Sequence, residues 1–339
     1  MIRCAEWCVI SSCLFGAGLF AEEAAELSPF AKEAANRIEA KPNVRGDGGD
    51  WFFLVQELRH LATGNFWESS WEEVAAQGEN PVEAMVEFKK LLDERGVRLI
   101  LAPIPAKARV YPEKLDEDFS LRDTPPLTPF LEELREKGFT VVDLDAELRE
   151  LRREDRTSRF YCAQDAHYSP KAIEILADRL ASELGGISAE NPAIHSGTEE
   201  RIEITGDQIV GSEWEGTVEP ESLTVTRIIE NEEFGVKPDP ESPVLLLGDS
   251  HTLVFHAGAE TGMHLRGAGL PDQLSYRLGQ AVDLVGVRGS GLVQARKQLF
   301  FRATSEPGYW DRKQAVVWVF SEREWTQLSD RLVSIPLDR

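Results

Sequence analysis

Pro243-Val-Leu-Leu-Leu-Gly-Asp-Ser250-His-Thr252 is an apolar run that passes directly into a glycine, an aspartate and a serine. The run predicts a buried strand over residues 244–247 that ends at Gly248, with a helix beginning directly after it. Ser250 would then lie at the carboxyl edge of a sheet, with the backbone N–H groups of the next turn near its hydroxyl. Asp249 and Ser250 are also favoured helix N-caps. This segment alone therefore leaves a capping role and a nucleophilic role open.

The chain on either side of this segment alternates between predicted strands and predicted helices. Further mostly apolar runs, typical of strands covered on both faces, occupy residues 97–104, 139–144, 282–287 and 315–320. Amphipathic helices are expected to begin near Pro81, at Thr128-Pro129 and at Ser169-Pro170. This alternation indicates an α/β fold with a doubly wound, mostly parallel sheet flanked by helices. Ligands of such sheets bind at the carboxyl ends of the strands, where Ser250 is predicted to lie.

A second polar segment, Tyr161-Cys-Ala-Gln-Asp165-Ala-His167-Tyr-Ser169-Pro170, precedes the serine in the chain. Asp165 and His167 are two residues apart, so an extended backbone places both side chains on one face. A serine becomes an effective nucleophile when a histidine takes its proton and a carboxylate holds the other ring nitrogen. The spacing fits this arrangement, and it fits a solvated turn or a capping aspartate as well.

The order and spacing of these segments and their flanks resemble the AlgJ/AlgX type of alginate O-acetyltransferases, a permuted branch of the SGNH (GDSL-like) hydrolases. In that family the Asp-x-His element precedes the serine, as it does here. The matching segments lie within about residues 46–325 and are Asp50-Trp-Phe-Phe-Leu54 with Glu57-Leu-Arg-His60, Ala102-Pro-Ile-Pro-Ala-Lys107 through Tyr111-Pro112, Gln164-Asp-Ala-His-Tyr168, Gly206-Asp207, Leu247-Gly-Asp-Ser250 and Val317-Trp-Val-Phe-Ser-Glu-Arg323. The sequence stops soon after Trp325 without the C-terminal carbohydrate-binding module of AlgX-type members, so its architecture is expected to be closer to AlgJ.

The resemblance implies a triad of Ser250, His167 and Asp165 in an exported O-acetyltransferase that modifies a polysaccharide through an acyl-enzyme. It also implies a membrane-bound O-acyltransferase as the source of the acetyl group. This chemistry requires no cofactor and no metal. A carbohydrate acetylesterase of the same fold would use the same residues, and a non-catalytic scaffold of a polysaccharide secretion complex is a third hypothesis.

A metal site is a rival interpretation of the polar segments, because the Asp-x-His pattern occurs in both of them. Asp165, His167, Asp249 and His251 would supply two carboxylates and two imidazoles, a ligand set that suits zinc or iron. This hypothesis leaves the serine corner without a purpose.

Four further residues are candidates for contacting the substrate or the oxyanion. Arg288 and Gly289 lie in a turn after a predicted strand and would supply a charged or a backbone donor, although a structural salt bridge fits Arg288 equally well. Tyr168 would either face the acceptor or pack. Asp249 would either support the serine turn through hydrogen bonds to nearby N–H groups or cap the helix.

Several other residues with suggestive chemistry are expected to be structural. Cys162, five residues before His167, is predicted to be a small buried strand residue rather than a nucleophile. His256 and His264 are expected to be surface or core histidines on and after the helix that follows Ser250. Trp67 and Trp71 would either stack on sugar rings or belong to the core.

Three stretches lie outside the alternating pattern. Residues 1–21 are predicted to be a secretory signal, since Arg3 precedes an apolar run up to Phe20 and the small residue Ala21. An uncleaved anchor is the alternative, and either one places the protein in the periplasm or outside the cell. Residues 22–45 are expected to form a helix and linker before an SGNH-like domain at 46–330. Within that domain, residues 187–240 are acidic and rich in turns, and predict a small β-rich insertion.

The composition is strongly acidic. The 59 aspartates and glutamates exceed the 37 lysines and arginines and give a formal net charge of −22. Nucleic acid is excluded as a partner, because its binding demands a basic surface. A polyanionic acceptor such as alginate would require a locally basic groove.

Overall fold

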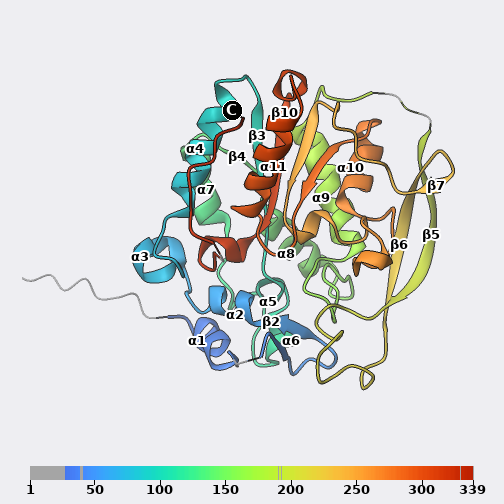
Figure 1. Cartoon of the computed structure of the whole chain (residues 1–339). Helices are drawn as coiled ribbons and strands as arrows, with labels where there is room; N and C mark the ends of the chain where they lie inside the picture. The colour runs from blue at the N-terminus through green and yellow to red at the C-terminus, as the bar shows by residue number, and fades with distance from the viewer. Residues whose placement is uncertain (1–26, 39–40, 190, 192, 329, 339) are drawn as a thin grey trace, which may run out of the picture.

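The structure is a computed structural model that describes residues 27–38, 41–189, 191, 193–328 and 330–338. The predicted signal at residues 1–21 lies outside this range. Within the described residues, no helix combines the length and the apolar composition that a bilayer span requires. Figure 1 shows helices packed around a central sheet, with a separate group of strands at one side.

The central sheet has five parallel strands in the order β4-β3-β10-β8-β9. Their bounds, in chain order, are β3 (Arg98–Ile104), β4 (Thr140–Val141), β8 (Val244–Gly248), β9 (Asp283–Gly286) and β10 (Ala315–Ser321). Every residue of β8 and β10 is buried, as expected for strands covered on both faces. The predicted α/β class with a parallel sheet is confirmed.

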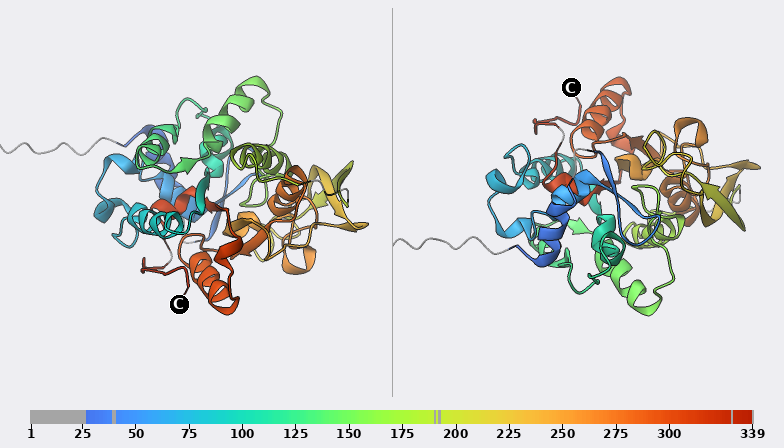
Figure 2. Two further views of the ribbon diagram at one scale, coloured as in Figure 1. Left: turned by 90° about the horizontal axis from the view of Figure 1, so that it is seen from above. Right: turned by 90° about the horizontal axis from the view of Figure 1, so that it is seen from below.

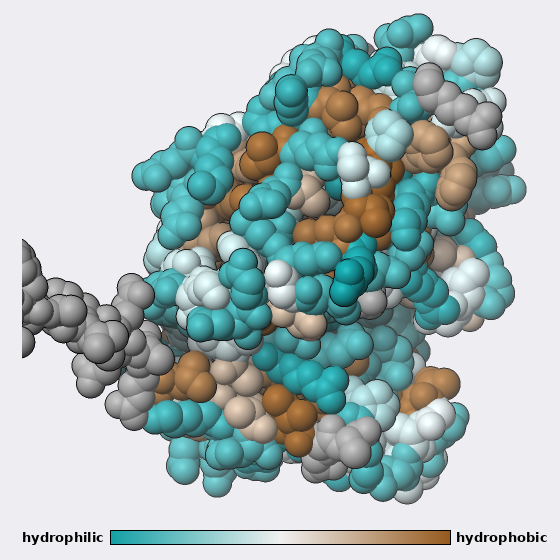
Figure 3. Space-filling view, turned by 60° about the vertical axis from the view of Figure 1, so that its left-hand side comes forward, coloured by the Kyte–Doolittle hydropathy of each residue, from teal (hydrophilic) through white to brown (hydrophobic). Residues whose placement is uncertain are grey.

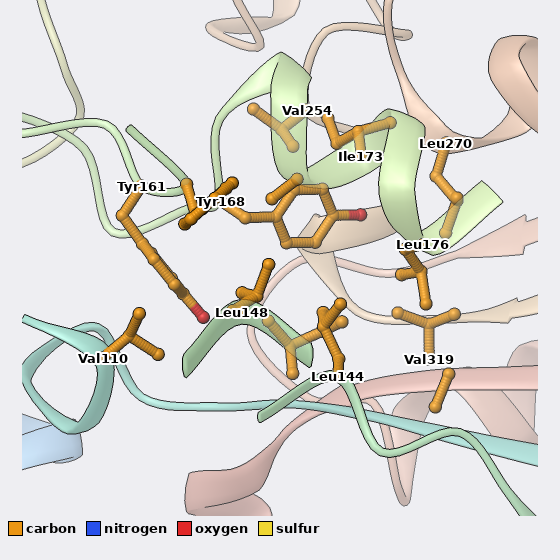
Figure 4. Packing of buried hydrophobic residues seen from close by; sticks show 14 of the residues in the cluster. Val110, Leu144, Leu148, Tyr161, Tyr168, Ile173, Leu176, Val254, Leu270 and Val319 are labelled. Carbon is orange, nitrogen blue, oxygen red and sulfur yellow. The ribbon is translucent and has the colours of Figure 1, made fainter. Parts of the chain in front are cut away.

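Helices cover both faces of the sheet (Figure 2). One face packs against α4 (Pro81–Asp93), α7 (Thr128–Glu136) and α11 (Gln294–Ser305). The other face packs against α8 (Leu144–Glu154), α9 (Pro170–Glu183) and α10 (Leu270–Leu278). Figure 4 shows this second layer, in which Ile173, Leu176 and Leu270 lie around the ring of Tyr168.

Side chains at the predicted helix starts fix where these helices begin. The Asn80 side chain accepts a hydrogen bond from the N–H of Val82 at the start of α4, and the Ser169 hydroxyl accepts one from the N–H of Ala172 in α9. Both starts are therefore as predicted. The predicted strand over residues 139–144 is shorter than expected, because Asp143 caps α8 and the chain becomes helical directly after it.

Elements from residues 29–74 and 107–115 form a small layer at the carboxyl ends of the strands, since α5 and α6 directly follow β3 (Figure 1). Its elements are α1 (Pro29–Asn36), β1 (Asn43–Arg45), β2 (Phe52–Leu54), α2 (Val55–Leu61), α3 (Trp71–Val74), α5 (Lys107–Val110) and α6 (Pro112–Leu115). Strands β1 and β2 pair as an antiparallel hairpin. The expected helix in residues 22–45 corresponds to α1, as far as the described residues reach.

The predicted β-rich insertion is an antiparallel sheet of β5 (Ile194–Ile204), β6 (Glu221–Glu230) and β7 (Glu233–Phe234). This prediction is confirmed. Leu223 and Val225 of β6 are buried in the same core layer as α9 and α10, so the insertion packs on that side of the molecule (Figure 1). Its β5–β6 loop returns to the Asp165 segment, because the N–H of Gln208 donates to the carbonyl of Gln164 at 3.1 Å.

The helix predicted after Ser250 is wrong. Residues Ser250–Thr252 form one 3₁₀ turn, and the next α-helix, α10, begins only at Leu270. Asp249 closes the turn, because its side chain accepts a hydrogen bond from the N–H of His251. Glycines at positive φ then interrupt the segment and prevent a continuous helix, at Gly258, Gly262 and Gly267.

The surface of the molecule is mainly polar. The face in Figure 3 is mostly hydrophilic, with hydrophobic side chains in groups separated by polar ones. Large hydrophobic residues that are exposed come from separate elements, for example Val86 of α4, Phe234 of β7 and Phe301 of α11. This distribution agrees with a chain of which 28% of the residues are charged.

Candidate active site

A buried lysine holds the loop that carries Asp165 and His167. Lys107 begins α5 at the end of β3, and its side chain is fully buried. Its ammonium group donates hydrogen bonds to the carbonyls of Cys162, Ala163 and Asp165 at 2.9, 3.1 and 2.7 Å. Three hydrogen bonds from one buried cation fix the path of this loop, because they pair carbonyls that are buried away from water. The Ala163 carbonyl also accepts a hydrogen bond from the N–H of Phe52 at 2.8 Å.

The insertion holds the same loop from the opposite direction. One carboxylate oxygen of Glu221 accepts hydrogen bonds from the N–H groups of Ala163 and Gln164 at 2.7 and 3.1 Å. Gly206 passes so close that a Cβ placed on it would lie 2.0 Å from the carbonyl oxygen of Gln164. Only glycine permits this approach.

Asp165 and His167 form a buried hydrogen-bonded pair. Oδ1 of Asp165 accepts hydrogen bonds from Nδ1 of His167 at 2.5 Å and from the His167 N–H at 3.0 Å. Their side chains are 2% and 8% exposed, so water barely competes for these bonds. Both side chains leave one side of the loop, as the sequence spacing predicted. The Asp207 carboxylate lies 3.8 Å from Nδ1 of His167.

The other oxygen of Asp165 contacts a residue that was expected to be an ordinary surface or core histidine. Nε2 of His264 lies 2.9 Å from Oδ2 of Asp165, and the N–H of Asp207 donates to the same oxygen at 2.9 Å. Asp207 and His264 are far from Asp165 in the chain, and no local pattern indicates either contact. Asp207 belongs to the Gly206-Asp207 segment that resembles the family, and this is the only feature of the sequence that singles it out. No feature of the sequence singles out His264.

Ser250 lies on the turn that follows β8, at the carboxyl edge of the sheet. Its hydroxyl oxygen is 2.8 Å from Nε2 of His167, and the side chain is half-buried. Gly248 ends the strand against β10, where a Cβ would lie 2.2 Å from the carbonyl oxygen of Val319. Ser250, His167 and Asp165 therefore lie in one hydrogen-bonded series.

Asp249 supports the serine turn. Its Oδ1 accepts hydrogen bonds from the N–H and Nδ1 of His251, each at 2.9 Å, and its Oδ2 accepts one from the N–H of Ser321 at 2.8 Å. The carboxylate is buried and fully used by these donors. The contact with the N–H of His251 caps the 3₁₀ turn and the contact with Ser321 ties it to β10, so Asp249 has both of the roles that the sequence left open.

Nearby carboxylates control the proton affinity of His167. Burial alone would favour the neutral ring, but the carboxylates of Asp165, Asp207 and Asp249 outweigh it and raise the pKa of His167 to about 9. Burial would likewise raise the pKa of Asp165, yet His167 and His264 hold it well below its usual value. Burial lowers the pKa of His251, which favours its neutral ring. The site thus combines an ionised aspartate with a strongly basic imidazole.

The remaining candidates lie at different depths. Tyr168 is fully buried and donates its hydroxyl proton to the carbonyl of His251 at 2.5 Å, so it packs and does not face an acceptor. Arg288 and Gly289 are exposed, beyond the carboxyl end of β9. Gly286 of β9 pairs with Gly248 of β8. Arg288 and Ser250 each follow their paired glycine by two residues, so they leave neighbouring strands at the same level of the sheet edge.

A groove runs along β9 beside the serine turn. It has a volume of ≈ 790 Å³ and is lined by residues that include Leu253, Arg288, Phe301, Arg302 and Glu306. Arg302 is paired with Asp283 at 2.6 Å. Arg288 has no hydrogen-bond or ion-pair partner among the residues that the structure describes, so the structural salt bridge considered for it is not formed there.

The four-residue metal site is not assembled. In the described part of the chain, the group with three ligand atoms within 4.8 Å of one another is Asp165, His167 and Asp207. Asp249 and His251 do not join it, because they form their own pair. Asp165, His167 and Asp207 lie together because Asp165 accepts hydrogen bonds from Nδ1 of His167 and from the N–H of Asp207.

Within the described residues, and apart from His264, the side chains expected to be structural form no hydrogen bond with the Ser250–His167–Asp165 series, and the position of Cys162 differs from the prediction. Cys162 is fully buried and burial raises the pKa of its thiol well above the usual value, which excludes it as a nucleophile; it lies in a loop and not in a strand. Trp67 and Trp71 are half-buried and pack against Phe130 at the edge of the core. His256 pairs with Asp272 at 3.0 Å.

Comparisons with known proteins identify the family and the fold. The family of the SGNH hydrolase-like domain of the acetyltransferase AlgX matches residues 48–322. The chain is 31% identical over 148 residues to the probable alginate O-acetylase AlgJ of Pseudomonas aeruginosa, covering 43% of this chain and 34% of that protein. It is 25% identical over 147 residues to the AlgJ of Azotobacter vinelandii, with 42% and 34% covered. The matched part thus spans about a third of the length of these curated relatives.

Two solved structures share the fold. The O-acetyltransferase domain of Pseudomonas putida AlgJ superimposes with a TM-score of 0.60 at 20% identity, over 86% of this chain and 94% of that one. AlgX of Pseudomonas aeruginosa gives a TM-score of 0.55 at 17% identity, over 87% and 66% of the two chains. The match of the family over residues 48–322 shows that the chain belongs to the SGNH hydrolase-like domains of the AlgX acetyltransferase family.

Proposed function

We propose that this protein is a serine-dependent O-acetyltransferase that acts on a polysaccharide. The observation that carries the proposal is the hydrogen-bonded series from Oγ of Ser250 through the ring of His167 to Oδ1 of Asp165, with separations of 2.8 and 2.5 Å. Such a series activates a serine for acyl transfer. The names of the relatives, which are O-acetylases, support the same reaction class.

In the first half-reaction, Ser250 would attack the carbonyl carbon of an acetyl ester. Nε2 of His167 takes the hydroxyl proton as the Oγ–C bond forms, and returns it to the leaving group as the ester bond breaks. Asp165 keeps the imidazole in the required tautomer and stabilises its charged form. The backbone N–H of Ser250 is the proposed donor to the oxyanion, with Arg288 or the N–H of Gly289 as the second.

In the second half-reaction, a sugar hydroxyl would attack the acetyl group on Ser250. His167 takes the hydroxyl proton and returns it to Oγ of Ser250 as the acyl-enzyme bond breaks, which restores the starting state. Water would follow the same route and release acetate. The half-buried Ser250 is reachable by either one, so acetyl ester hydrolysis is the second candidate function.

The groove beside the serine turn is the proposed binding site for the acceptor. Two of its lining residues are arginines and one is a glutamate. Arg302 is paired with Asp283, so Arg288 is the lining arginine whose charge is left for an acceptor. The relatives are named for alginate, a polymer of uronate sugars. Arg288, which lacks a partner within the described residues, would bind a sugar carboxylate there.

Export and the acetyl supply are further parts of the proposal. The predicted signal at residues 1–21 would place the enzyme in the periplasm or outside the cell. A membrane-bound O-acyltransferase would then deliver the acetyl group across the membrane, because acetyl donors are made inside the cell. A scaffold without catalytic activity is less well supported, since it has no use for the contact between Ser250 and His167.

The proposal is tested by incubating the protein with a donor ester, with and without oligosaccharide acceptors. The parent protein should produce acetylated oligosaccharide, and Ser250→Ala should not. Ser196→Ala, which changes an exposed serine of the insertion, is the matched control and should retain full activity. Release of acetate that no acceptor diverts would establish the hydrolase instead, and no turnover by the parent protein with any donor ester would favour the scaffold.

A further inference from the structure

We propose that His264 is a positioning residue that holds Oδ2 of Asp165, so that Oδ1 is presented to His167. This inference rests on the proposed function, because positioning Asp165 matters only if His167 acts as a base. His264 contributes through the carboxylate and does not touch Ser250 in the structure.

The hydrogen bonds of Asp165 carry the proposal. Oδ1 accepts from Nδ1 and the N–H of His167, and Oδ2 accepts from the N–H of Asp207 and from Nε2 of His264. An ionised carboxylate is only an acceptor, so Nε2 of His264 carries the proton in this contact. Without His264, Oδ2 would keep one donor only, and the carboxylate would be free to rotate away from His167.

The backbone of His264 is an independent observation. His264 has φ of 64° and Phe255 has φ of 57°, in the left-handed region that non-glycine residues rarely occupy. Hydrogen bonds from the N–H of Phe255 to Met263 and from the N–H of Ala268 to Phe255 brace this segment. The rings of Phe255 and His264 lie 5.1 Å apart. A strained backbone that is held on both sides aims the imidazole at Asp165.

The other charged groups around the pair do not replace His264. The Lys107 ammonium binds the backbone carbonyl of Asp165 and not its carboxylate. Asp207 and Asp249 are acidic and act on His167, and His251 packs edge-on against the His167 ring at 4.9 Å. His264 is therefore the side-chain donor to Oδ2 within the described residues.

Two substitutions separate the hydrogen bond from the packing. His264→Phe keeps a ring against Phe255 and removes the donor, whereas His264→Gln keeps an N–H donor of similar reach and removes the ring. The measurement is the rate at which a fluorophosphonate probe labels Ser250 as a function of pH, together with kcat and KM for a donor ester. We expect His264→Phe to lower the labelling rate and kcat about 10- to 100-fold with KM unchanged, since it removes a hydrogen bond to a charged group.

The pH profile distinguishes positioning from a general loss of structure. Once the Asp165 carboxylate is no longer held against Nδ1, it stabilises the protonated ring of His167 less, so the acid limb of the profile should move to lower pH. His264→Gln should recover most of the rate. His256→Gln, in the other buried histidine–aspartate pair of this segment, is the control and should leave the rate and the limb in place.

Two results would overturn the inference. One is a parent-like rate and pH limb in His264→Phe, and the other is equal impairment of the Phe and Gln variants, which would assign the effect to packing. The proposed function fails separately, if the parent protein and Ser250→Ala are labelled alike.

Discussion

The two Asp-x-His elements of this protein share a local geometry and differ in what surrounds them. In each, one carboxylate oxygen accepts hydrogen bonds from the N–H and Nδ1 of the histidine two residues later, at 3.0 and 2.5 Å for Asp165 and at 2.9 and 2.9 Å for Asp249. Both histidine side chains are buried, with 8% and 6% exposed. The difference lies at Nε2, which binds Ser250 in His167 and is buried without a hydrogen-bond partner in the described surroundings of His251.

The Asp-x-His motif thus determines that the aspartate and the histidine pair, and the surrounding fold determines what the paired histidine does. Three carboxylates face His167 and raise its pKa to about 9, whereas burial lowers the pKa of His251. His251 instead accepts a hydrogen bond from Tyr168 at its carbonyl, and its ring stacks on that of Tyr168. We therefore expect the first pair to act as a base and the second to brace the nucleophile turn.

Replacing each histidine by alanine is the strongest way to break the comparison. His167→Ala should lower kcat by about 10³-fold or more, because Ser250 loses its base. His251→Ala should lower kcat less than about tenfold and the free energy of unfolding by about 2 kcal/mol, since it leaves a cavity beside Tyr168. Steady-state kinetics with a donor ester and urea unfolding measure the two effects. Equal losses of kcat would contradict the separate roles.

The aspartates allow the same comparison without a cavity. Asp165→Asn should lower kcat by about 10³- to 10⁴-fold, because an amide no longer holds the His167 tautomer that accepts a proton. Asp249→Asn should cost far less activity, since the amide oxygen can still accept from the N–H of His251 or Ser321. Circular dichroism checks that both variants are folded. An Asp249→Asn loss as large as that of Asp165→Asn would show that the second pair is also part of the reaction.

How much of this the sequence could predict depends on the range of each interaction. The strand β8 and the Ser169 cap are local, so sequence pattern and propensity predict them. The spacing of Asp165 and His167 permits their pair, and the family resemblance selects it among the alternatives. His264 lies 99 residues from Asp165 in an irregular segment. Its contact with Asp165 depends on a backbone with positive φ at His264, and a histidine in the sequence does not predict that conformation. A lysine side chain is expected to be exposed to solvent. Lys107 is buried because carbonyl groups of the loop at residues 162–165 turn toward its ammonium group and accept its hydrogen bonds.

Lys107 tests whether the two pairs are held independently. Lys107→Met should lower the free energy of unfolding by about 3 kcal/mol, because three carbonyls of the Asp165 loop lose a buried cation. It should also slow labelling of Ser250, since Asp165 and His167 are displaced. The second pair rests on Ser321 and should be little affected.

Lys313→Met is the matched control for this change. Lys313 is a second buried lysine, and it donates to the carbonyls of Pro240 and Ser242 before the start of β8. Lys313→Met should lower the free energy of unfolding by a similar amount and leave the labelling rate of Ser250 in the folded protein unchanged. A parent-like labelling rate in Lys107→Met would show that the loop keeps its path without the cation.

The smallest expected effect concerns the charge that distinguishes the two histidines. A protonated His167 cannot take the serine proton, so kcat/KM should rise with pH through the pKa of this residue, about 9, and level off above it. Asp207→Asn removes a negative charge 3.8 Å from Nδ1 and keeps an oxygen that can accept from the N–H of Ala166. The pKa of His167 should therefore fall, the acid limb should move to lower pH, and activity at pH 7 should increase. Glu213→Gln removes a charge from the same loop and is the control. A shift of the acid limb to higher pH in Asp207→Asn would contradict the conclusion that the Asp207 carboxylate raises the pKa of His167.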